Sequence, residues 1–102
     1  IQLTSLVEES KLKPIHSFFT SKVAPNPFNP STSLQLNVLE ANHFLIQLYS
    51  ITGKLIKTIA DTNFKSGNFS FSINGNNLSS GVYFIKITSN NKLHVEKITL
   101  IK

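Results

Sequence analysis

The histidines and serines of this chain lack the spacing that nucleophilic catalysis or metal binding requires. His16, His43 and His94 lie far apart, without ligand-type intervals and without an acidic residue that we expect beside them. Serines are plentiful, but none lies in a nucleophile elbow or has a paired histidine. We therefore expect three surface histidines and no catalytic triad.

The acidic residues form no pair that could act as acid and base. Glu8 and Glu9 are adjacent, so their side chains point apart in an extended chain, and Asp61 and Glu96 are each alone in their segments. Asp61 lies near Asn63, but the two are too sparse for a calcium-binding loop. The chain has no Cys, which excludes disulfides and thiolate metal sites. We therefore expect no enzyme and no bound cofactor or metal.

The charge pattern indicates a solvated surface rather than a nucleic-acid-binding one. The formal net charge is +5, and the basic residues, all of them Lys, are scattered from Lys11 to Lys102. Without Arg the chain cannot bind phosphate in the bidentate manner, and a nucleic-acid groove would carry denser basic and aromatic residues. No apolar run reaches the length of a membrane span. The chain begins at Ile1 without a signal peptide, so we expect it to be part of a longer protein.

The elements that must position any site are short strands separated by turns. Apolar and polar residues alternate in four segments, two weaker segments follow the same pattern, and no segment has a helical stripe. This pattern predicts an all-β, immunoglobulin- or fibronectin-like antiparallel sandwich of about seven strands. The strong segments are residues 34–38, 44–48, 69–73 and 83–87, and the weak ones are 55–59 and 95–101. The expected core residues are Leu36, Ile46, Leu48, Phe71, Ile73, Ile85 and Ile87.

Turn residues support this architecture. Thr52-Gly53-Lys54 and Asn90-Asn91 contain residues that tolerate the positive φ of tight hairpins. Tyr83 opens a strand after a turn, where the hydroxyl of a tyrosine corner would bond back to the upstream backbone. The alternative is that Tyr83 is a core aromatic with its hydroxyl at the rim. The sequence does not decide between the two.

A proline-rich segment precedes the strands. Three of the four prolines fall in Pro25-Asn26-Pro27-Phe28-Asn29-Pro30. Proline fixes φ at about −65° and biases the preceding residue toward extended geometry. We therefore expect an extended entry with a turn at Asn29-Pro30, in which Phe28 fills the edge of a core. Taken alone, such a segment is more often a rigid linker into a β domain.

The first part of the chain differs from the rest. Residues 1–22 are polar without sustained periodicity, which predicts a linker or the tail of an upstream domain, and residues 23–102 form the predicted β-sandwich domain. Residues 15–19 could add a short strand or lie on the edge of the sandwich.

Four segments, in the same order along the chain, resemble the type A C-terminal sorting domain of the type IX (Por) secretion system, and the resemblance covers residues 15–102. Residues 23–32 resemble its opening motif, tyrosine-proline-asparagine-proline-phenylalanine-asparagine-proline. Residues 48–54 resemble its strand with a glycine-basic turn, and residues 78–87 its third signature. Residues 97–102 resemble its final basic-apolar strand.

Three positions depart from the family pattern. Ala24 replaces the usual tyrosine, and Ile73 stands where an aromatic residue is frequent. Ser50 replaces an aspartate, which removes any polar contact that the carboxylate makes in the family. All three substitutions keep the strand register.

The resemblance implies a sorting address rather than an enzyme. The domain would follow an upstream cargo domain at its C-terminal side, and the cargo would reach the periplasm by the general secretory route. The outer-membrane translocon would recognise it, a sortase-like peptidase would typically remove it, and the cargo would be secreted or attached to the cell surface. The implied sorting-motif residues are Pro25, Asn26, Pro27, Phe28, Asn29, Pro30, Gly81, Val82, Tyr83, Lys97 and Lys102.

Two other functions share this fold. A fibronectin-like accessory module of a secreted enzyme would bind glycan or act as a spacer, and glycan binding needs an exposed aromatic platform. The chain has no Trp and two tyrosines, although Phe18, Phe19 and Phe84 could be partly exposed. A structural cap or adhesion domain of a surface fibre is the third possibility.

Overall fold

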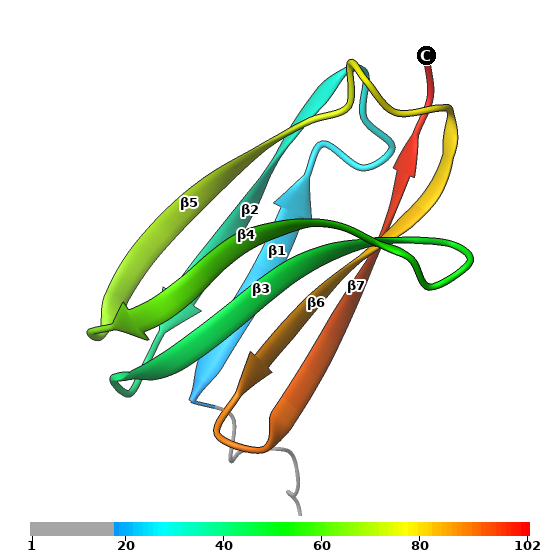
Figure 1. Ribbon diagram of the computed structural model, residues 1–102. Helices are drawn as coiled ribbons and strands as arrows, with labels where there is room; N and C mark the ends of the chain where they lie inside the picture. The colour runs from blue at the N-terminus through cyan, green and yellow to red at the C-terminus, as the bar shows by residue number, and fades with distance from the viewer. Residues whose placement is uncertain (1–17) are drawn as a thin grey trace, which may run out of the picture.

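The computed structural model describes residues 18–102, which form seven strands in two antiparallel sheets packed face to face (Figure 1). One sheet has the order β1-β2-β5, and the other has the order β4-β3-β6-β7. The predicted all-β sandwich is therefore confirmed. The strands are β1 (Phe19–Ala24), β2 (Ser31–Val38), β3 (Asn42–Ser50), β4 (Leu55–Phe64), β5 (Gly67–Asn74), β6 (Gly81–Ser89) and β7 (Lys92–Leu100).

The core lies between the sheets and is built from alternate residues of the strands. Period-two alternation turns one set of side chains of each strand toward the facing sheet, and the central strands β2, β3 and β6 supply most of the fully buried residues. Six of the seven expected core residues are buried. The buried six are Leu36, Ile46, Leu48, Ile73, Ile85 and Ile87.

Phe71 is the exception, because it is only partly buried. It lies on β5, which is the edge strand of its sheet, and it faces β4, the edge strand of the other. Its ring packs against that of Phe64 with a centroid distance of 5.8 Å. Phe71 therefore closes the open flank between two edges instead of filling the centre of the core.

The predicted turns are present. Asn90 and Asn91 have φ of 47° and 67° at the β6–β7 hairpin, and Gly53 has φ of 88° at the β3–β4 hairpin. In the latter turn the Ser50 hydroxyl accepts a hydrogen bond from the Lys54 N–H at 3.2 Å. Ser50 thus makes a polar contact of its own at the position where the family pattern has aspartate.

Tyr83 forms a tyrosine corner. Its hydroxyl donates to the carbonyl oxygen of Ser79 at 2.6 Å, and the residue is only 8% exposed. Of the two alternatives that the sequence left open, the structure supports the one in which the hydroxyl bonds back to the upstream backbone.

The sandwich begins earlier than residue 23. β1 pairs with β2 from Phe19 onward, and Phe18 and Phe19 are both 7% exposed. The expectation that these two rings could be partly exposed is therefore wrong, because they pack against Phe44 in the core. The proposed linker and the possible strand at residues 15–19 fall largely on residues 1–17, outside the described part of the chain.

Several strand ends meet at one end of the sandwich, which we call the motif end. The pairings Ala24↔Ser33, Ser31↔Asn74 and Gly81↔Leu100 bring the ends of β1, β5 and β7 beside the starts of β2 and β6. In Figure 1 this is the upper end, where the label C lies. The motif end comprises residues 25–32, 75–83 and 97–102.

Candidate functional site at one end of the sandwich

The proline-rich segment lies along the edge of β7. The Phe28 N–H donates to the Thr99 carbonyl at 2.9 Å, and the Ile101 N–H donates to the Phe28 carbonyl at 3.0 Å. These bonds form a parallel bridge between Phe28 and Leu100. The Phe28 side chain is 2% exposed, as expected for a residue that fills the edge of the core. A one-residue piece of extra strand therefore covers the last part of β7.

Asn26 extends this pairing with its side chain. Its Nδ2 donates to the Lys97 carbonyl at 2.9 Å, and its Oδ1 accepts from the Thr99 N–H at 3.0 Å. A primary amide carries a donor and an acceptor side by side, as a peptide group does. The side chain of Asn26 thus stands in for the backbone of a neighbouring strand. This gives a physical reason for asparagine rather than aspartate at this position of the motif.

The loop after β5 closes the motif end from the other side. The Gly75 N–H donates to the Pro30 carbonyl at 2.7 Å, and Gly75 is buried. An added Cβ there would lie 2.9 Å from Leu100 Cδ2 and 3.1 Å from the Pro30 oxygen. No side chain larger than hydrogen fits between these neighbours without displacing them. Sequence reasoning missed this close packing, because no local pattern shows which segments a loop glycine will contact.

The final residues are bound to the same loop. The Lys102 N–H donates to the Ser80 hydroxyl at 3.0 Å, and Lys102 Nζ donates to the Asn76 carbonyl at 2.8 Å. Lys97 and Lys102 are exposed, and the Lys102 ammonium, which gives one N–H to Asn76, keeps two donors for a partner. Sequence reasoning missed Asn76 and Ser80, because a backbone carbonyl or a single hydroxyl that accepts a hydrogen bond has no recognisable motif.

The third predicted group belongs to the same neighbourhood. Gly81, Val82 and Tyr83 pair with Leu100, Thr99 and Ile98 across β6 and β7. The structure therefore brings together all three groups of sorting-motif residues that the sequence predicted. They are far apart in the chain, with a separation of 71 residues between Asn26 and Lys97.

A family model described as a secretion system C-terminal sorting domain matches residues 22–102. The chain belongs to this family. It is a C-terminal sorting signal of type IX secretion, and the accessory-module alternative is not favoured. A sorting signal of this kind serves a secreted or cell-surface cargo and interacts with the type IX machinery, and the family is not a catalytic one. No curated protein matches the chain.

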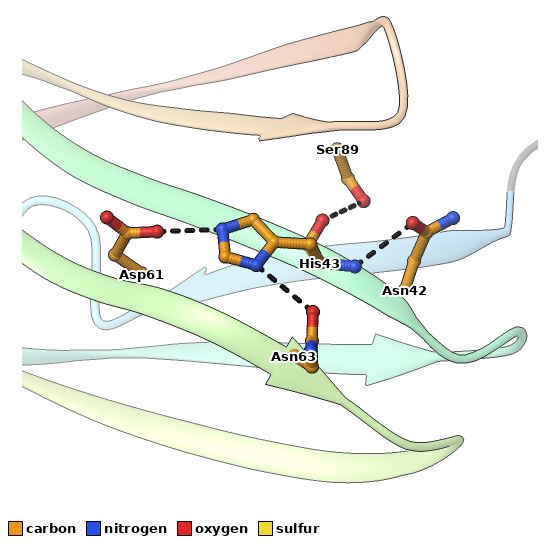
Figure 2. A network of polar contacts seen from close by, with 5 residues as sticks. All are labelled: Asn42, His43, Asp61, Asn63 and Ser89. Atoms are coloured by element: carbon orange, nitrogen blue, oxygen red, sulfur yellow. Dashed lines mark hydrogen bonds and ion pairs between the residues drawn. The ribbon is translucent and has the colours of Figure 1, made fainter.

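The opposite end of the sorting domain carries a polar network around His43, which Figure 2 shows. His43 Nε2 lies 2.7 Å from Asp61 Oδ1, and His43 Nδ1 lies 3.1 Å from Asn63 Oδ1. The Ser89 hydroxyl donates to the His43 carbonyl at 2.5 Å. The expectation of no acid beside the histidines is therefore wrong for His43. Strand pairing places Asn63 and Asp61 on β4 beside β3, which sequence distance does not reveal.

This network lacks the geometry of a catalytic triad. Both ring nitrogens of His43 are occupied, one by Asp61 and the other by Asn63, and the Ser89 hydroxyl bonds to the backbone instead of the ring (Figure 2). A triad needs a serine hydroxyl on one ring nitrogen and a carboxylate on the other. The network joins β3, β4 and β6 at the surface, where the His43 and Asp61 side chains are 53% and 60% exposed.

His94 also has an acidic neighbour. Its Nε2 lies 2.8 Å from Glu96 Oε2, and the same carboxylate oxygen accepts from the Ser21 hydroxyl at 2.5 Å. These contacts join β7 to β1 across the flank of the sandwich. Within residues 18–102, no group of three or more His, Cys, Asp or Glu side chains could hold a metal ion. The described residues also contain no helix long and apolar enough to cross a membrane.

A groove of about 530 Å³ lies between the edges of β4 and β5. Its apolar lining comes from aliphatic side chains, and its polar lining comes from Lys57 and neutral residues near Asn76. Glycan-binding platforms stack sugar rings on flat aromatic side chains, and this groove has none in its lining. The aliphatic lining residues are Leu48, Ile56, Ile59, Ile73 and Leu78.

Proposed function

We propose that the outer-membrane translocon of the type IX system recognises the motif end of this domain as a folded unit, after the cargo has reached the periplasm. The observation that carries the proposal is the double attachment of β7. Residues 98–100 pair with β6 on one side, and Asn26 and Phe28 bond to residues 97–101 on the other. The opening motif, residues 81–83 and the final strand therefore lie together at one end of the sandwich.

The residues of the motif end divide into two groups. Phe28 and Tyr83 are buried and maintain the shape of this end. The prolines, Asn29, Lys97 and Lys102 are exposed and form the surface that a partner would contact. In this proposal the partner binds the exposed group, and the buried group determines how that surface is shaped.

Release of the cargo follows from the same arrangement. Peptidases cleave extended chain that is not paired in a sheet, and the described chain is paired in β1 from Phe19 onward. We place the cut of the sortase-like peptidase before Phe18, in the segment that the sequence predicts to be a linker. The domain itself acts as an address and performs no reaction.

The test is export of a reporter. A periplasm-directed reporter fused ahead of residues 1–102 is expressed in a host with a type IX system, and reporter at the surface and in the medium is measured. The parent fusion should be exported. Deletion of residues 97–102 should abolish export, because it removes Ile98 and Leu100 from the core and leaves residues 81–84 of β6 without a partner strand on that side.

A milder variant distinguishes loss of recognition by the translocon from loss of folding. Lys97→Ala with Lys102→Ala changes two exposed side chains, so the domain should stay folded while export falls. Lys22→Ala with Lys65→Ala, also exposed but outside the motif end, is the matched control and should export normally. A parent fusion that stays folded in the periplasm, in a host that exports its own cargo, would refute the proposal. Binding to insoluble polysaccharides would then be measured next, as a test of the accessory-module function.

A further inference from the structure

The first half of β7 has an open edge. In an antiparallel pair every second residue turns its N–H and C=O away from the partner strand. On β7 these include Thr99 and Lys97, whose outward backbone groups bond to Phe28 and Asn26. The β6–β7 register runs without a shift, so the backbone groups of Val95 and Leu93 turn the same way. In the described part of the chain no hydrogen bond is made to them.

The side chains at this edge are apolar and exposed. Leu93 is 59% exposed and Val95 is 46% exposed. Exposed aliphatic side chains on an unpaired edge strand are a hazard for aggregation, which proteins usually remove. Leu93 and Val95 lie on the same face of β7 two residues apart, so a strand added at this edge would have two neighbouring apolar side chains to cover.

The charge around the edge is positive. Lys97 is exposed and lies two residues after Val95 on the same face of β7. Lys86, opposite Val95 in the β6–β7 register, holds its ammonium over the Tyr49 ring on β3, 5.1 Å from the ring centroid, and so on the side of β6 away from this edge. The one acid on the strand, Glu96, turns its carboxylate to Ser21 and His94 on the core-facing side. A partner segment with an acidic residue would therefore meet Lys97, whose ammonium has no acidic partner within residues 18–102.

The second half of the same edge already holds an extended segment. Phe28 pairs with it in parallel, and the Asn26 side chain continues the bonding toward Lys97. The geometry of β7 is therefore compatible with an added strand at residues 97–101. The continuation toward Leu93 has the same backbone pattern and no occupant among residues 18–102.

We propose that the edge formed by residues 92–97 binds an extended strand of a partner protein by strand addition. The partner strand carries alternate aliphatic side chains over Leu93 and Val95 and an acidic side chain opposite Lys97. A second copy of this chain is a poorer occupant, because each copy has a formal net charge of +5. The inference rests on the proposed function in one respect, since it takes the partner to be a component of the export machinery.

The first test uses synthetic peptides and the full 102-residue chain. The probes are acetylated heptapeptide amides that alternate valine and threonine and end in glutamate, in both sequence directions. One control peptide has N-methylated valines, which removes backbone donors and keeps the side chains. Another has lysine in place of glutamate. Binding is measured by NMR titration, and amide exchange at Leu93 and Val95 is followed in the free and bound chain.

At least one of the two probes should bind and slow amide exchange at Leu93 and Val95. N-methylation and the lysine substitution should each weaken binding by at least about tenfold. Equal binding of the N-methylated peptide, or no slowing at these two amides, would overturn the proposal. So would slow exchange in the free chain, because the edge would then be covered by residues 1–17 or by a second copy.

A variant tests the edge from the side of the protein. Val95→Pro removes an N–H that points away from β6, so no hydrogen bond between β6 and β7 is lost. Edge strands tolerate proline at positions of this kind. Val95→Thr keeps the N–H and is the matched control. Val95→Pro should weaken peptide binding by at least about tenfold and Val95→Thr by less than about threefold. The N-methylated peptide keeps the test decisive if the proline variant unfolds.

Export separates this inference from the proposed function. The Val95→Pro fusion, if folded, should lose export of the reporter while Val95→Thr keeps it. Normal export of a folded Val95→Pro fusion that no longer binds peptide would overturn the inference and leave the sorting function intact. Failure of the parent fusion itself would instead overturn the sorting function, whatever the peptides do.

Discussion

Asn26 has a role that only its own side chain can perform. It is exposed, yet its amide makes two hydrogen bonds to the backbone of β7. The sequence marked Asn26 through its place in the motif, but the reason for an amide there became visible only beside Lys97 and Thr99. Residues that contact segments distant in the sequence give no local signal of their partner.

Replacing Asn26 with Ala should destabilise the domain by about 1–2 kcal/mol, since two hydrogen bonds are lost from a site that water reaches. Asn29→Ala is the matched control, because the Asn29 side chain makes no hydrogen bond within residues 18–102. Urea unfolding followed by tyrosine fluorescence measures both. Equal stability of the two variants would mean that the Asn26 amide does not hold β7 in solution.

Gly75 should be intolerant of even one added carbon. Gly75→Ala places a Cβ against Leu100 and the Pro30 carbonyl, and overpacking of this kind costs about 1–3 kcal/mol. Gly53→Asn serves as the control, because nothing lies within 4 Å of a Cβ there and asparagine tolerates the positive φ of that turn. Thermal unfolding would compare the two. A Gly75→Ala variant as stable as the parent would show that the loop can move away from Leu100.

At the scale of elements, the alternating segments predicted most strands and their inward faces. The predicted length of β4 is too short, because the strand extends to Phe64 and the alternating segment ends at residue 59. Its pairing with β3 has register shifts at Ile46/Gln47 and Leu48/Tyr49, and such irregularities break the period-two pattern that sequence reasoning uses. The attachment of the proline-rich segment to β7 was not predictable either, because nothing local specifies a pairing across the length of the domain.

Phe71 tests how β5 packs at the edge of its sheet. A fully buried phenylalanine costs about 3–5 kcal/mol on truncation to Ala. Because Phe71 is only partly buried, we expect about 1.5–3 kcal/mol for Phe71→Ala. Phe44→Ala, at a position with 0% exposure, should reach the full range. Chemical denaturation would measure both, and a Phe71→Ala variant within about 0.5 kcal/mol of the parent would contradict the strand register.

At the scale of the whole molecule, stability should depend on packing and hydrogen bonds alone. The chain has no Cys, and residues 18–102 contain no cluster of three metal-binding side chains. We expect the melting temperature to change by less than about 1 °C in a chelator or a reductant. A chelator lowers stability only where a bound metal stabilises the folded state, and a reductant only where a disulfide does. Differential scanning calorimetry would measure this. A fall of several degrees in chelator would point to the cluster of His43, Asp61 and Asn63.

The bond between Asn26 and residues 97–99 has a consequence for biosynthesis. The motif end forms only when the proline-rich segment and β7 have both emerged from the ribosome, because Asn26 and Phe28 have their hydrogen-bond partners on β7. A cargo whose translation stopped early would carry the proline-rich segment without the strand that gives it shape. Under the proposed recognition of the motif end, the translocon would bind only a domain whose β7 has been made, so the recognition step would also reject incomplete cargo.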